Sequence, residues 1–427
     1  MSLRSTTFLV LVCIGVAPAI LRSQGLEYRM SIVDEGTLNA LNKTTPINYD
    51  NCILPQPHRG NIGTSNLFLS VGGLSALLDL STNTDNLRSP DYTYSFREFS
   101  FDYSLSDAVD ITIGKKILKW GTGYAFNPTG VVEPQRSPSD PSDRLGQNEG
   151  SKIAEIDYFK GRSSLTFVYV NDARVDSWKW HWGVQEVAAR AYTFLNGLDL
   201  SLVAHYREGD RLEVGTNGSY VLGSNLELHA EFLGKKGSSA LYHNIITTDD
   251  DQQVFASYPY VPLYRYSNQI FYKFLLGGQF TFDNGLNIAV EYYRNTEGLT
   301  TMEWQRWMKF VKFQNGIQQG SVPVSPDLVA PSRFNLLWAL QTLSPRGAMQ
   351  DYCFGREYFA EDRWGIELIE FINAQDFSTV IIPTVSFKLS ENFSTYARLA
   401  LFTGRSDSEF GALFYQKTLN LGIQFQL

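Results

Sequence analysis

Titratable side chains recur at every second position in several stretches of this sequence, with apolar residues between them. In the clearest example, Glu227, His229 and Glu231 are each separated by a single apolar residue. Because successive side chains of a strand point to opposite faces, such a stretch places its charges on one surface and its apolar groups on the other. Charges that line a narrow, water-filled space select ions and polar solutes by sign and size. The other residues of this expected pore-lining set are Asp102, His205, Arg207, Glu291, Lys388 and Arg398.

These charges also allow a simpler interpretation. Any one of them could simply form an ion pair with another charge and stiffen the wall of a hydrated interior. As a set, they indicate a hydrated lumen rather than a packed core.

The most distinctive motif begins at Lys119 and reads Lys-Trp-Gly-Thr-Gly-Tyr-Ala-Phe-Asn-Pro, and a run rich in proline and charge follows it. Its two glycines permit backbone angles closed to other residues, whereas the prolines restrict the chain. Long loops are usually functional or disordered, and this one is too stiffened for disorder. It could be an ordinary external loop that packs on the rim; its resemblance to loops of porins implies instead a constriction folded into the lumen. The constriction residues would be Trp120, Tyr124, Arg136, Asp140, Asp143 and Arg144.

Motifs of common enzymes are absent from the sequence. It contains no Gly-x-Ser-x-Gly, no His-Glu-x-x-His and no phosphate-binding loop, and none of its histidines begins the His-x-Ser-Asn element of barrel phospholipases. We therefore predict no catalytic residues, no metal site and no cofactor. The net charge of −8 argues against nucleic acid as a partner, because phosphates demand a basic surface.

The elements that must position these residues are hairpins. Six segments consist of an alternating strand, a tight polar turn and a second alternating strand. Their turns lie at residues 106–108, 161–164, 196–197, 223–225, 283–285 and 390–392. One strand near 67–80 and a terminal strand at 419–427 bring the expected number to about fourteen, within a range of 12 to 16, because residues 333–372 could hide another hairpin.

The connections between the hairpins differ in length. Four are long, at residues 120–150, 234–270, 296–332 and 404–415. Short turns at one end and long loops at the other are typical of transmembrane barrels.

The amino-acid composition favours a barrel whose strands face lipid on one side and water on the other. Aromatic residues make up 14% and charged residues only 19%, whereas soluble domains average nearer a quarter charged. The mean hydropathy of −0.18 suits strands with one apolar and one polar face. The predicted fold is thus all-β, a single-domain transmembrane antiparallel up-and-down barrel.

The N-terminal region divides into two parts before the barrel. Residues 1–19 have the basic start, uncharged apolar stretch and small-x-small site of a signal peptide, and the cut could fall as late as residue 24. Residues 20–63 show no clear period and are predicted to form a periplasmic tail or a small plug. The barrel would then span residues 64–427.

The stretch from Trp120 to Pro128, with the charged run after it, resembles a segment of porin-like barrels of Gram-negative bacteria, broadly of the alginate-export type. The resemblance implies an outer-membrane channel for passive diffusion of small hydrophilic or sugar-like solutes. The partners it implies are outer-membrane lipid, the barrel-assembly machinery through the C-terminal strand, a small-molecule solute and, as an option, further copies in a homo-oligomer. Two alternatives stay open: a plugged barrel that takes up hydrophobic compounds, and a non-conducting structural or adhesin barrel.

Overall fold

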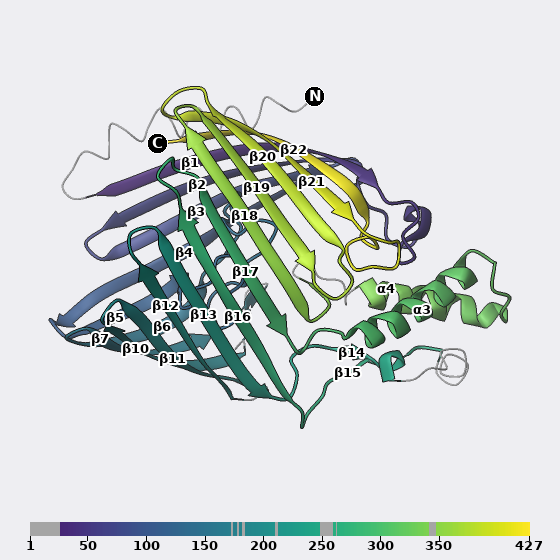
Figure 1. The fold of residues 1–427 in the computed structure, drawn as a ribbon, viewed down its shortest axis with the longest axis horizontal. Helices are drawn as coiled ribbons and strands as arrows, with labels where there is room; N and C mark the ends of the chain where they lie inside the picture. The colour runs from purple at the N-terminus through teal and green to yellow at the C-terminus, as the bar shows by residue number, and fades with distance from the viewer. Residues whose placement is uncertain are drawn as a thin grey trace.

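A closed antiparallel β-barrel forms the body of the molecule in the computed structural model (Figure 1). The structure describes residues 26–171, 174–176, 179–181, 184–209, 212–247, 259–261, 263–340 and 347–427. Within them, each barrel strand pairs with its neighbours in sequence, and β1 closes the ring against β22. The predicted signal peptide lies outside the described residues. The all-β, up-and-down barrel class is confirmed.

The first barrel strands are β1 (Glu27–Leu41), β2 (Arg59–Val71), β3 (Leu74–Asp85), β4 (Asp91–Ser106), β5 (Val109–Lys116), β6 (Ser151–Lys160) and β7 (Ser163–Asn171). The next are β10 (Gln185–Leu195), β11 (Leu198–Arg207), β12 (Glu213–Leu222), β13 (Leu226–Lys236), β16 (Ile270–Thr281) and β17 (Asn287–Asn295). The last are β18 (Asp351–Glu361), β19 (Trp364–Asn373), β20 (Thr379–Lys388), β21 (Phe393–Thr403) and β22 (Tyr415–Gln426).

The remaining elements belong to the long connections. Two small hairpins pair β8 (Arg174–Asp176) with β9 (Lys179–His181) and β14 (Tyr242–His243) with β15 (Leu263–Tyr264). The helices are α3 (Thr301–Gln318) and α4 (Val329–Leu340), and the short 3-10 turns are η1 (Tyr49–Asn51), η2 (Asn244–Thr247) and η3 (Pro326–Leu328).

The barrel has eighteen strands, so the expected number of about fourteen is wrong. The region around 67–80, read as one strand, is the end of β2 and the start of β3, with a turn at Gly72 and Gly73 between them. Strand β1 lies in the segment predicted as a tail or plug, and it escaped notice because Asp34 and Gly36 interrupt its outward apolar positions.

The other two missed strands, β18 and β19, form the hairpin within residues 333–372. Their inward positions carry large apolar side chains such as Tyr352, Phe354 and Phe371, all of which are buried. Large apolar side chains lie on both faces of this hairpin, and Arg356, Glu357, Glu367 and Glu370 are divided between the two faces, so the sequence shows no clear alternation there. The reason is that the inner wall contacts an apolar cluster rather than water at this point.

Short turns and long connections lie at opposite ends of the barrel, as expected. Asn196 and Gly197 form a two-residue turn with positive φ angles of 50° and 89°, which few other residue pairs adopt without strain. The described chain starts and ends at this short-turn end. The helices α3 and α4 pack together at the opposite end, at the lower right of Figure 1.

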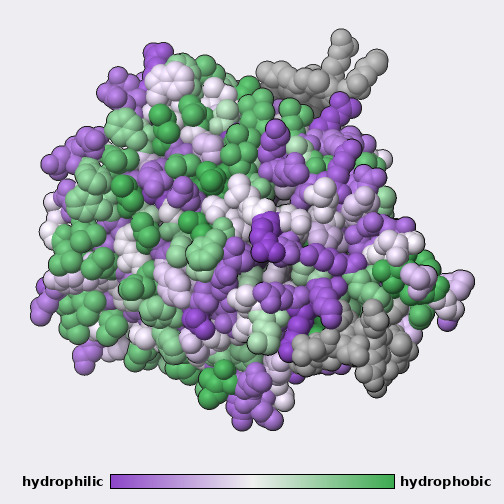
Figure 2. Space-filling model, turned by 45° about the vertical axis from the view of Figure 1, so that its right-hand side comes forward, coloured by the Kyte–Doolittle hydropathy of each residue, from purple (hydrophilic) through white to green (hydrophobic). Residues whose placement is uncertain are grey.

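No helix among the described residues combines the length and the apolar character that a bilayer crossing requires. The outer surface of the barrel instead carries the outward apolar side chains of the strands, among them Leu202, Leu276, Val290, Leu421 and Ile423. Apolar residues cover much of the left-hand part of Figure 2, and hydrophilic residues gather toward its centre and right. This apolar belt is what a wall in contact with lipid requires.

Placing a charge on the belt should destabilise the barrel. Ile423 is 55% exposed on the outer face of β22, whereas the neighbouring Gln424 points inward. We expect Ile423→Arg to lower the free energy of unfolding in lipid vesicles by about 2–4 kcal/mol. Gln424→Arg serves as the control and should change it much less; equal effects of the two variants would contradict a lipid-facing belt. Urea unfolding followed by tryptophan fluorescence measures both.

Candidate functional site: a loop inside the barrel

The connection between β5 and β6, residues 117–150, runs through the interior of the barrel. Its residues contact inward-facing side chains of β12, β13, β17 and β18 on one flank and of β1, β4 and β21 on the other. The loop therefore crosses the lumen instead of packing on an outer rim.

A buried carboxylate on β13 holds the first part of this loop. Glu231 is 1% exposed, and its Oε1 accepts hydrogen bonds from the backbone N–H groups of Thr122 at 2.5 Å and Gly123 at 2.7 Å. Its Oε2 accepts from the backbone N–H and the hydroxyl of Thr129, at 2.8 and 2.6 Å. Asn217 on β12 adds a bond to the carbonyl of Trp120 at 3.0 Å. The interior thus supplies the partners that this loop's buried amides need.

A second buried carboxylate, Glu291 on β17, holds the next two amides. It accepts hydrogen bonds from the backbone N–H groups of Tyr124 and Ala125, the latter at 2.9 Å. The imidazole Nε2 of His229 lies 3.0 Å from Glu291 Oε1, and its Nδ1 lies 2.9 Å from Glu227 Oε2. Three residues of the predicted pore-lining set are thus joined in one chain of contacts.

The later part of the loop is fastened to the opposite flank by ion pairs. Arg144 contacts the buried Glu35 of β1 and the hydroxyl of Tyr396. Arg398 bonds to the carbonyl of Ser139 and lies 3.6 Å from Asp140.

The loop returns to the wall beside β4. Arg97 lies 3.1 Å from Asp143 and donates to the carbonyl of Asn148 at 2.7 Å. Buried charges are stable only when paired, so the contacts of Glu35, Arg97 and Arg398 depend on the loop being in place.

Aromatic side chains of the loop pack against the inner wall. Trp120 is 4% exposed and lies in an apolar cluster with Val168, Val170 and Val203 of the wall. Tyr124 contacts Phe354, with ring centroids 5.8 Å apart, and lies under the guanidinium of Arg356 at 5.0 Å. Burial of these rings adds an apolar contribution to the polar anchoring of the loop.

A cavity of about 570 Å³ remains between residues 126–136 of the loop and the wall formed by β10–β13, β16 and β17. We call it the chamber. The charged residues that line it are Glu133, Arg136, Glu149, Glu186, His205, Arg207, Glu213, Lys235 and Lys273.

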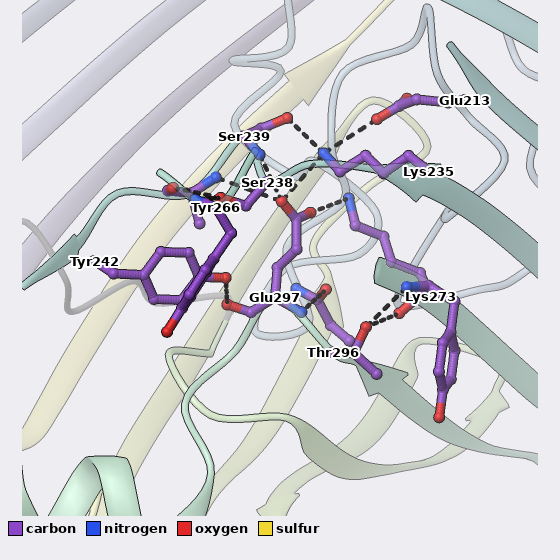
Figure 3. A network of polar contacts seen from close by, with 12 residues as sticks. Glu213, Lys235, Ser238, Ser239, Tyr242, Tyr266, Lys273, Thr296 and Glu297 are labelled. Atoms are coloured by element: carbon purple, nitrogen blue, oxygen red, sulfur yellow. Dashed lines mark hydrogen bonds and ion pairs between the residues drawn. The ribbon is translucent and has the colours of Figure 1, made fainter. Parts of the chain in front are cut away.

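An unbroken series of ion pairs runs along the chamber wall. Arg207 contacts Glu186 at 3.3 Å, and His205 lies between Glu186 and Glu213, at 3.0 and 3.2 Å. Lys235 continues the series, 3.2 Å from Glu213 and 3.1 Å from Glu297, as the view in Figure 3 shows. Lys273 ends it 3.8 Å from Glu297. The wall therefore offers many hydrogen-bonding groups but little uncompensated charge.

The mouth over β17–β21 is filled by apolar side chains. A buried apolar cluster joins inward residues of these strands to α3 and to the connections at residues 42–58 and 404–414; it includes Trp307, Phe310, Phe354, Phe371 and Phe410. Among the described residues, the cluster lies beside β17–β21 and the chamber beside β10–β17.

One carboxylate fastens two of the mouth connections to each other. Glu409 is 1% exposed and accepts hydrogen bonds from the Ala348 backbone N–H, from the Tyr352 hydroxyl at 2.9 Å and from Asn373 Nδ2 at 2.6 Å. Burial raises the pKa of Glu409 to about 7. Asp376 accepts from the backbone N–H of Glu409 at 2.7 Å.

The remaining sequence-predicted residues do not bind the loop to the barrel wall. Arg136 lines the chamber and donates to the carbonyl of Gly121 at 3.2 Å. Asp102 pairs with Lys116 at 2.7 Å, and Lys388 is exposed at the short-turn end of β20.

Sequence reasoning missed several residues that hold or line this site. They are Glu35, Arg97, Glu186, Glu213, Asn217, Lys235, Glu297 and Tyr396. Glu213 and Asn217 alternate with Val214 and Thr216, a signal that the glycines of β12 obscured.

Comparison with known proteins rests on structure. No protein-family model matches the sequence, and no curated protein sequence matches it either. Among solved structures, OccK5 (OpdH) of Pseudomonas aeruginosa superposes with a TM-score of 0.54 at 9% identity, over 94% of this chain and 98% of that one. The fold is that of an outer-membrane porin.

Two further P. aeruginosa structures agree. OpdO gives a TM-score of 0.52 at 9% identity, over 94% of this chain and 97% of its own. OccK11 (OpdR) gives 0.51 at 9% identity, over 94% and 96%. At such low identity the likeness establishes the barrel architecture, so the porin-like part of the resemblance is confirmed as a fold.

Weakening the first carboxylate anchor should loosen the loop. In Glu231→Gln one oxygen is replaced by an NH₂ group, which faces loop N–H donors and cannot accept from them. We expect a loss of about 1–3 kcal/mol in the free energy of unfolding and faster proteolysis within residues 117–150. Glu361→Gln, at the exposed end of β18, is the control and should stay within about 0.5 kcal/mol of wild type. Wild-type behaviour of Glu231→Gln would show that the carboxylate does not anchor the loop.

Stability should fall as pH rises through the ionisation of Glu409. Its pKa in the folded protein is raised from 4.5 to about 7, so its contribution is fully present below pH 4.5 and is lost as pH rises through about 7. Glu409→Gln imitates the protonated form, so it should abolish the part of the pH-dependent decrease in the free energy of unfolding that Glu409 causes, up to about 3 kcal/mol. Urea unfolding at about pH 5 and pH 8 measures it. The exposed Glu391→Gln should keep the wild-type profile, and an unchanged slope in Glu409→Gln would refute the assignment.

Proposed function

We propose that this protein is an outer-membrane channel through which small hydrophilic solutes diffuse passively. The observation that carries the proposal is the charged chamber of about 570 Å³ beside a loop anchored inside the barrel. A barrel that served only as an anchor would need neither. The porin fold and the apolar belt support an outer-membrane location.

The solute route follows the chamber. Solute enters on the side of β10–β16, because the apolar cluster fills the mouth over β17–β21. His205, Arg207 and Arg136 then meet the solute in the chamber. Glu231 and Glu291 are occupied by loop amides, so their part in selection is to fix the loop that narrows the passage.

Uncharged, hydroxyl-rich solutes suit the chamber best. Its wall charges are already paired, and a monovalent ion would have to separate one of these pairs to bind there. A sugar hydroxyl, by contrast, can donate to a paired carboxylate or accept from a paired ammonium group without breaking the pair. The ring of Tyr293 on the chamber wall adds an apolar surface for a sugar face.

Uptake of hydrophobic compounds is the second candidate, because aromatic side chains gather at the mouth. Phe371 and Phe410 lie 5.0 Å apart and are each buried, as is Trp307. These side chains pack against one another, so an apolar solute would have to displace them. We therefore favour the polar route.

Lipid around the belt and a small solute in the chamber are the partners this function needs. Insertion by the barrel-assembly machinery through β22 and association of several copies stay predictions. The proposal assigns no catalytic residue and no cofactor.

Conductance of the refolded protein in a planar bilayer tests the proposal. We expect stable ohmic steps, with weak ion selectivity and a block of the current by neutral oligosaccharides. Arg136→Gln should shift the reversal potential toward cations, because the substitution removes a positive charge from the chamber. Arg363→Gln, at an exposed turn of the opposite end, is the matched control and should leave the reversal potential unchanged. A correctly folded barrel that never conducts would refute the channel and favour a structural role.

A further inference from the structure

His229 is buried between two carboxylates in the barrel wall. Its side chain is 3% exposed, with Nδ1 2.9 Å from Glu227 and Nε2 3.0 Å from Glu291. The side chain of Glu291 is 0% exposed and also accepts two loop amides. His229 thus reaches the loop only through Glu291, and among the described residues it forms no hydrogen bond with the loop itself.

The two contacts define the charge of this imidazole. A neutral histidine carries one N–H donor, and its other nitrogen offers only a lone pair. Two ionised carboxylates at hydrogen-bond distance from both nitrogens are therefore matched by an imidazole that is protonated on both. The resulting imidazolium also compensates the charge of the buried Glu291.

Gly277 of β16 makes this contact geometrically possible. It pairs with His229 on one side and with Glu291 on the other, so the three residues lie in one row across β13, β16 and β17. A Cβ at Gly277 would collide with the imidazole and with the Glu291 side chain. The missing side chain leaves the space in which the imidazole reaches across a whole strand to meet the carboxylate.

We propose that the His229 imidazolium is a positioning residue, which orients Glu291 so that this carboxylate holds the Tyr124 and Ala125 amides of the loop. This deepens the proposed function, since a fixed loop gives the channel a defined passage. Without the imidazolium, Glu291 would lose its only recorded cationic partner among the described residues and would turn away from the loop.

Among the described residues, no cation other than His229 forms an ion pair with Glu291. On its own strand His229 is flanked by Glu227 and Glu231, and opposite to it lie Ser219 of β12 and Gly277 of β16. Glu291 faces it from β17.

Amide hydrogen exchange of the loop tests the proposal without reference to transport. In His229→Phe, which keeps a ring but has no donor, we expect the amides of Tyr124 and Ala125 to exchange at least about tenfold faster. The Thr129 amide, held by Glu231, should keep its protection. His205→Phe is the matched control: its imidazole also lies between two carboxylates but has no recorded contact with the loop, so Tyr124 and Ala125 should not change. Unchanged exchange in His229→Phe would overturn the proposal.

A second measurement needs no variant at position 229. Nitrogen NMR of the ring in His205→Phe, which removes the other sandwiched imidazole, should show two protonated ring nitrogens for His229 at pH 7; a neutral ring would overturn the proposal. Gly277→Ala should reproduce the faster exchange of Tyr124 and Ala125. Conductance distinguishes failure of the proposed channel from failure of the positioning role of His229. A protein that never conducts but shows these exchange changes would refute the channel and leave the positioning role intact.

Discussion

The interaction on which the interior depends is that between buried carboxylates and the backbone amides of a loop. A chain that leaves the wall and enters a barrel loses its solvent partners, and each unpaired amide would cost about 1–3 kcal/mol. Glu231 and Glu291 supply acceptors for the amides of residues 122–125 and 129. In turn, the loop amides compensate the burial of these carboxylates, so neither side is stable without the other.

The interior of the barrel is divided into a part occupied by the loop, a part filled by an apolar cluster and the chamber. The loop engages Glu231 of β13, Glu291 of β17 and Arg398 of β21, and an apolar cluster fills the mouth over β17–β21. What remains polar and open is the chamber wall, where ion pairs are satisfied among themselves. The free space inside the barrel is therefore shaped by what the loop and the cluster leave unoccupied, more than by the diameter of an eighteen-strand ring.

The barrel class, the end with short turns and the interior-facing side of β13 could be predicted from alternation, because each strand face has a single environment. Strands β18 and β19 could not, since their inner face is apolar where it meets the cluster. Glu35 was missed because β1 alternates poorly, and its partner Arg144 lies far away in sequence. Alternation shows which face a residue occupies, but it does not reveal whether solvent, a loop or a packed cluster covers that face.

The loop is fastened to β12, β13 and β17 on one flank and to β1, β4 and β21 on the other. Strands β1 and β21 come together only through β22, the last strand of the chain. The order of assembly follows from this connectivity: the loop's second set of anchors cannot be completed before the ring closes. The joint contact of Arg144 with β1 and β21 therefore has to wait for closure of the seam between β1 and β22, although the anchors on β12, β13 and β17 can already hold the loop in the interior.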